Sequence, residues 1–128
     1  MMLAMKYQLA FLQQFFYKCR IMKVARLYTG NDGESHFDEI EVEVEKLQAT
    51  EGIQFRVGPP GQVQDWHPAP RRQYVITLSG QGEIEIGDGT KRRFGPGDIM
   101  LADDLTGRGH VTRVVGSQPR LYVQVPLK

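Results

Sequence analysis

Apolar and polar residues alternate strictly in two stretches of the middle of the chain. Segment 40–45 alternates Ile and Val with Glu, and segment 53–57 alternates Ile, Phe and Val with Gln and Arg. A period of two is that of a β-strand with one face turned to a core and the other to solvent. We therefore predict half-buried strands in both stretches.

Short β-branched or alternating runs follow one another down to the C-terminus. They are 74–78, 83–86, 91–94, 99–102, 110–115 and 121–125. Clusters of Gly, Pro, Ser and Asp separate them, as expected for turns. No convincing helix follows Met22, so no crossover helix can connect parallel strands and parallel α/β architectures are excluded. Roughly nine short strands predict an all-β sandwich or barrel.

Composition narrows the class of protein further. A length of 128 residues suits one domain with one core, and 41% hydrophobic with 24% charged residues is close to the average of globular chains. This balance argues against a membrane protein and against long disorder. A net charge of +1 gives the protein no overall electrostatic attraction for nucleic acid. No nucleic-acid or membrane partner is therefore predicted. The single cysteine, Cys19, excludes an intrachain disulfide and a Cys-rich metal site.

The N-terminal segment differs from the rest of the chain. Five basic residues and no acidic one precede Asp32, and apolar residues in 1–21 recur at helical spacing. The segment is too short and too polar to span a bilayer, and it lacks the Ser and Arg richness of a transit peptide. We predict a dispensable extension, 1–21, with a weak targeting segment as the alternative, and a domain covering 22–128. The predicted location is cytoplasmic.

Two glycine- and histidine-containing patterns occur within the predicted strands. In the first, Gly61 is followed after five residues by His67, after one more by Ala69, after three by Gln73 and after six by Gly80. This spacing resembles the first motif of the cupin family, in which His and Glu stand at the positions of Ala69 and Gln73.

The second pattern opens at Gly97-Asp98 and closes at Gly107–His110. It resembles the second cupin motif but is two residues longer, with Asp103 in place of Pro and Val114 in place of Asn. The resemblance covers about 40–125. It implies a cupin-type double-stranded β-helix, a conical jelly-roll barrel whose ligand site lies inside.

The resemblance also implies a divalent metal, Fe, Mn, Ni or Zn, held by imidazoles and a carboxylate, and no organic cofactor. Carried over by position, His67, Gln73 and His110 are the candidate metal ligands. Gln73 is neutral and holds a divalent ion less firmly than Glu, whereas Asp103 or Asp104 could restore the carboxylate. The alternative is that these are ordinary hydrogen-bonded residues in a polar turn. His36 lies outside both motifs.

Four residues are candidates for ligand binding: Trp66, Arg71, Asp104 and Tyr122. Trp66 either forms an aromatic wall beside a ligand or closes one mouth of the barrel. Arg71 shares the face of Gln73 and could clamp a carboxylate. Tyr122 and Gln124 share one face of their strand, and the sequence alone does not say whether that face is the inner one.

Two functions remain open. The first is a metal-dependent enzyme of dioxygenase, decarboxylase or isomerase type that acts on an oxygen-rich small molecule, such as a keto acid, sugar acid or phenol. The second is a non-catalytic barrel that serves as a ligand-binding or interaction module. Small cupins of this kind usually pair, and the alternating strands offer edges that need cover, so we predict a homodimer.

Overall fold

The computed structural model describes residues 15–16 and 20–128. Most of the predicted extension 1–21, with Cys19, therefore lies outside the described residues, and its dispensability stays a prediction. Eleven strands and no helix are found in the described part: β1 (Phe15–Phe16), β2 (Ile21–Thr29), β3 (Ser35–Glu43), β4 (Gln54–Gly58), β5 (Val63–His67), β6 (Gln73–Ser79), β7 (Gln81–Glu85), β8 (Lys91–Phe94), β9 (Ile99–Asp103), β10 (His110–Val115) and β11 (Arg120–Pro126). None of this part forms a helix long and apolar enough to cross a membrane.

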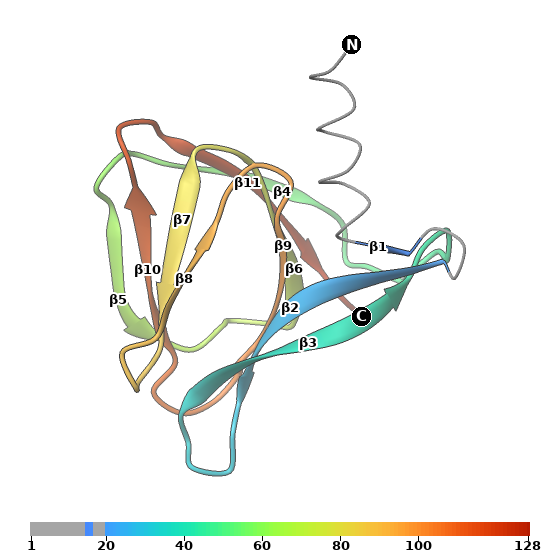
Figure 1. Cartoon of the computed structure of the whole chain (residues 1–128), viewed down its shortest axis with the longest axis horizontal. Helices are drawn as coiled ribbons and strands as arrows, with labels where there is room; N and C mark the ends of the chain where they lie inside the picture. Colours follow the sequence, from blue (N-terminus) through green and yellow to red (C-terminus); the bar gives the residue numbers. More distant parts are fainter. Residues whose placement is uncertain (1–14, 17–19) are drawn as a thin grey trace.

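The strands form two sheets that face each other (Figure 1). The larger sheet has the order β1-β2-β9-β6-β11-β4, with β3 paired to β2, and the smaller has the order β5-β10-β7-β8. From β4 to β11 the chain thus supplies two four-stranded sheets, β9-β6-β11-β4 and β5-β10-β7-β8, in which neighbouring strands are all antiparallel. Eight strands wound in this order are a jelly roll. The prediction of an all-β jelly-roll barrel is confirmed.

The larger sheet is buried on both faces in its centre. Adjacent residues of β2, Val24 and Ala25, and of β9, Met100 and Leu101, are all buried although they point to opposite faces. Ala25 and Met100 belong to the core between the sheets. Val24 and Leu101 belong to a second cluster, to which β3 contributes Val42. The double burial makes the centre of this sheet a rigid wall for the barrel interior.

The predicted burial of segment 53–57 is wrong. Its apolar side chains, Ile53, Phe55 and Val57, are 62%, 65% and 66% exposed. Strand β4 forms at the expected place, but it is the last strand of its sheet and pairs only with β11. The described residues place no further element over this edge, so the alternation produces an exposed apolar face rather than a half-buried one.

Candidate functional site

A cavity of about 60 Å³ lies between the two sheets. This space exceeds the volume of about 10–15 Å³ that a single water molecule needs. Its apolar wall includes Val75, Ile84 and Met100, and no carboxylate among the described residues lines it. Its main polar side chains come from both sheets: His67, Gln73, His110, Arg120, Tyr122 and Gln124. The three predicted metal ligands and Tyr122 therefore do line one cavity.

A β-bulge brings His67 to the cavity beside His110. Strand β5 pairs with β10 so that His110 lies opposite His67 and Thr112 lies opposite Gln64. Three residue steps on β5 thus match two on β10, and the extra residue turns Gln64 and His67 to the same side. The two imidazole rings are 4.6 Å apart between centroids, at an interplanar angle of 55°. The longer second motif does not displace His110.

Both imidazoles are oriented through the same ring nitrogen. His67 Nδ1 donates to the backbone carbonyl oxygen of Asp65 at 2.6 Å, and His110 Nδ1 donates to Asp104 Oδ2 at 2.6 Å. An Nδ1 that donates in this way fixes the tautomer of a neutral ring and leaves Nε2 as the free acceptor. Each of the two histidines therefore keeps one ring nitrogen available for a ligand.

Asp104 supports the site from behind. Its side chain is completely buried, and Oδ2 accepts hydrogen bonds from Ser35 Oγ at 2.7 Å and from His110 Nδ1. It does not line the cavity. The residue predicted to touch a ligand or to supply a metal carboxylate thus positions His110. The neighbouring Asp103 instead lies 3.4 Å from Arg72 Nε.

Gln73 is 2% exposed, and Arg71 orients its amide from the rim. Arg71 Nε donates to Gln73 Oε1 at 3.0 Å, and Nη2 donates to Gln54 Oε1 at 3.3 Å. Arg71 is exposed and is not part of the cavity lining. The structure therefore shows Arg71 engaged with two glutamines rather than open to a carboxylate inside the barrel.

Two other aromatic or imidazole candidates lie away from the cavity. The Trp66 ring is half-buried and stacks against the Arg108 guanidinium at 3.8 Å, and neither residue lines the cavity. His36, at the start of β3, has its Nε2 hydrogen-bonded to Oδ2 of Asp32 in the turn before that strand, at 2.9 Å. The structure assigns neither side chain to the cavity wall.

Arg120 is a cavity residue that the sequence analysis did not identify. It is 4% exposed and lines the cavity together with Tyr122 and Gln124. These three positions on β11 are two residues apart, so their side chains share one face. Recognising Tyr122 as an inner residue would have identified Arg120 as well. Burial lowers the pKa of the Arg120 guanidinium, while nearby Tyr122 opposes that shift weakly.

The cavity residues do not complete a divalent-metal site. Its donors are two imidazoles and the neutral amide of Gln73, whose oxygen already accepts from Arg71. The described residues contain no group of three or more His, Cys, Asp or Glu side chains arranged around one point. The Arg120 guanidinium in the same wall adds a positive charge that opposes a dication. The metal implied by the cupin resemblance thus lacks its carboxylate here.

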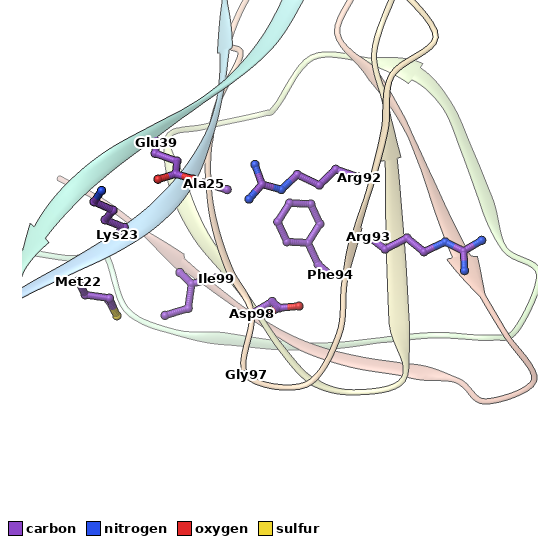
Figure 2. A pocket seen from close by; sticks show the side chains of 10 residues that line it. All are labelled: Met22, Lys23, Ala25, Glu39, Arg92, Arg93, Phe94, Gly97, Asp98 and Ile99. Atoms are coloured by element: carbon purple, nitrogen blue, oxygen red, sulfur yellow. The ribbon is translucent and has the colours of Figure 1, made fainter. Parts of the chain in front are cut away.

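A second hollow of about 280 Å³ is bordered by β2 and β3 of the larger sheet and by β8 of the smaller one (Figure 2). Arg92 extends from β8 toward β2, whereas Arg93 points the opposite way. Lys23, Glu39 and Asp98 also border the hollow. Charges of both signs line this hollow and no imidazole does, so it does not share the chemistry of the barrel cavity.

Comparisons with known proteins give structural likenesses only. No family model and no curated protein matches the chain. One similar solved structure is a conserved protein of unknown function from Streptococcus pyogenes, at 26% identity over 67% of this chain and 71% of that chain, TM-score 0.45. Another is a Cupin 2 conserved barrel domain protein from Salinispora arenicola, at 15% identity over 84% and 76%, TM-score 0.48. The cupin domain of Cnp3 from Schizosaccharomyces pombe has 13% identity over 85% of both chains, TM-score 0.46.

Proposed function

We propose that this protein binds a small molecule inside its barrel, in the cavity lined by His67 and His110. The observation that carries the proposal is the convergence of two oriented imidazoles on one cavity, each with Nε2 free. Imidazole Nε2 accepts a hydrogen bond from a ligand hydroxyl, amide or acid proton. The cavity therefore offers hydrogen-bond acceptors at fixed positions and not only apolar contacts.

The burial of the polar wall supports the same proposal. His110 is 5% exposed, and Gln73 is similarly enclosed, yet both face a space rather than packed apolar side chains. Buried polar groups that lack partners cost free energy, so proteins normally satisfy them with hydrogen bonds or replace them with apolar residues. A ligand that hydrogen-bonds to this wall removes the cost.

A metal-dependent enzyme is the second candidate. The orientation of His110 favours it, because a carboxylate behind a histidine is a common arrangement around metal ligands. The incomplete donor set counts against it, since Gln73 is neutral and already bound by Arg71. For this reason a ligand-binding barrel without a resident metal is the first candidate.

The test is an NMR titration of the full chain with three small probes: acetate, acetamide and glycerol. The chain has three histidines, and His36 lies outside the cavity, so it serves as an internal control. We expect at least one probe to shift the ring resonances of His67 and His110 saturably while His36 stays unchanged. If no probe shifts the two cavity histidines, or if all three histidines shift together, the proposal is overturned.

A further inference from the structure

Arg120 is buried in the cavity wall with few polar contacts. Its Nε and Nη2 donate to the hydroxyl oxygen of Thr77 at 3.3 Å and 3.0 Å, and its guanidinium carbon lies 4.4 Å from the centroid of the Tyr122 ring. A single neutral hydroxyl oxygen accepts both of these hydrogen bonds. A guanidinium has five N–H donors, so this set of contacts leaves most of its capacity unused.

The other buried or half-buried arginines of the described part have a carboxylate beside them. Arg26 pairs with Asp38, and Arg113 lies 2.7 Å from Glu85. For Arg120, no carboxylate of the described residues lies within salt-bridge distance, and no carboxylate lines the cavity. Arginine stays charged in proteins, so an unpaired cation sits inside the barrel.

The opposite sheet makes room for this cation. Gly82 of β7 lies against the guanidinium, and a Cβ at Gly82 would be 2.5 Å from its central carbon. Any side chain larger than hydrogen at this position would displace Arg120. The barrel is thus shaped around a charged side chain where an apolar one would pack at a lower cost.

We infer that the ligand of the cavity is a small monocarboxylate whose carboxylate group binds Arg120. The inference rests on the proposed function and names the chemical class of its ligand. Guanidinium and carboxylate match in shape and form paired hydrogen bonds. One guanidinium balances one negative charge, which fits a monocarboxylate better than a doubly charged phosphate. A cavity of about 60 Å³ admits a molecule as small as acetate.

The position of Arg120 also sets the order of contacts along the cavity. Arg120, Tyr122 and Gln124 follow one another on the inner face of β11, and Gln124 pairs with Val75, close to Gln73 at the start of β6. The four residue steps from Arg120 to Gln124 span about 13 Å along a strand. The carboxylate of the ligand is therefore held at the Arg120 end, next to Tyr122, and its other end points along the cavity toward Gln124.

The experiment compares acetate with its neutral analogue acetamide in the same NMR titration. Acetate is expected to shift the Arg120 Nε–H resonance saturably and to bind at least tenfold more tightly than acetamide. Inorganic phosphate serves as the competing anion and is expected to bind more weakly than acetate. The Arg120 resonance is read in the unmodified chain, so the result does not depend on a variant that folds.

Arg120→Gln and Arg120→Lys provide the second measurement, with Lys91→Gln as control because Lys91 is exposed on β8 and lies outside the cavity. We expect Arg120→Gln to weaken acetate binding at least tenfold, Arg120→Lys to weaken it less, and Lys91→Gln to leave it within twofold. If acetamide or glycerol binds as tightly as acetate, the carboxylate inference is overturned while the proposed function stands. Tighter binding of phosphate also overturns the inference. Absence of binding by every probe overturns both.

Discussion

Ala69 and Gln73 stand at two positions where the cupin resemblance implies metal ligands. Both side chains are buried and line the cavity together with His67 and His110. Ala69 has no donor atom, and Gln73 has no charge. Restoring an imidazole and a carboxylate at these positions supplies four ligands, a set that suits divalent transition metals.

We therefore expect Ala69→His with Gln73→Glu to bind about one divalent metal per chain, whereas the unmodified chain binds substoichiometric amounts. The added carboxylate attracts a dication directly, although Arg71 offsets part of its charge. Elemental analysis and Zn²⁺ titration measure the stoichiometry. The control adds His67→Ala to the double variant and is expected to lose the metal. An empty double variant would show that His67 and His110 cannot converge on one ion.

The site residues that could be predicted are those that the cupin resemblance ties to a motif. His67, Gln73 and His110 follow from the glycine and histidine pattern, and the structure brings all three to one cavity. Arg120 could not be predicted in this way, because a period of two says which residues share a face but not which face is inner. The position of Asp104 behind His110 depends on how the loop before β10 folds, which no local pattern encodes.

At the scale of elements, the approach of β5 to β10 depends on Gly109. Its φ is +81°, in the left-handed region, and a Cβ would lie 2.0 Å from the carbonyl oxygen of His67. Gly89, in the turn between β7 and β8, has a similar φ of +88° but open space around it. Substituting each glycine in turn therefore distinguishes the cost of backbone strain from the cost of a clash between the two strands.

We expect Gly109→Ala to lower the free energy of unfolding by more than about 3 kcal/mol, because it adds a backbone clash to the conformational strain. Gly89→Ala carries the strain alone and is expected to cost about 1–2 kcal/mol. Urea unfolding followed by circular dichroism measures both. Equal losses for the two variants would mean that β5 and β10 can separate freely at His67 and His110.

Most strands were predictable from alternation or from short β-branched runs, β9 with its two buried faces included, whereas β2 and β5 were not. The alternation in 40–45 correctly indicated the end of β3, where Val42 is buried between exposed glutamates. Strand β2 shows no such alternation, because Val24 and Ala25 are both buried on opposite faces of the sheet. Strand β5 is short, polar and bulged, so its sequence resembles a loop.

At the scale of the whole molecule, the apolar face of β4 stays exposed among the residues that the structure describes. Ile53, Phe55 and Val57 lie next to one another along the free edge of the larger sheet. An unpaired edge with apolar side chains is a surface on which a second strand adds readily. A second copy of the chain offers the same strand and the same side chains.

We expect the protein to be a homodimer at micromolar concentration and Phe55→Glu to make it a monomer with an unchanged fold, since the Phe55 side chain is already exposed in the single chain. Leu47→Glu is the control, because Leu47 is exposed outside β4 and the variant is expected to stay dimeric. Multi-angle light scattering measures the mass. A monomeric unmodified chain, or a dimer that survives Phe55→Glu, would contradict the role of β4.

If Arg120 binds a carboxylate as proposed, its buried cation would link the lifetime of this protein to the supply of that ligand. A buried charge without a counterion destabilises the empty barrel, whereas an anion beside it stabilises only the folded state. At a ligand concentration one hundred times the dissociation constant, that gain is about 2.7 kcal/mol. A change of about 1–2 kcal/mol is enough to alter the amount of a protein in a cell several-fold, because proteases remove the unfolded fraction. Cells that lack the carboxylate would therefore degrade this barrel faster than cells that contain it.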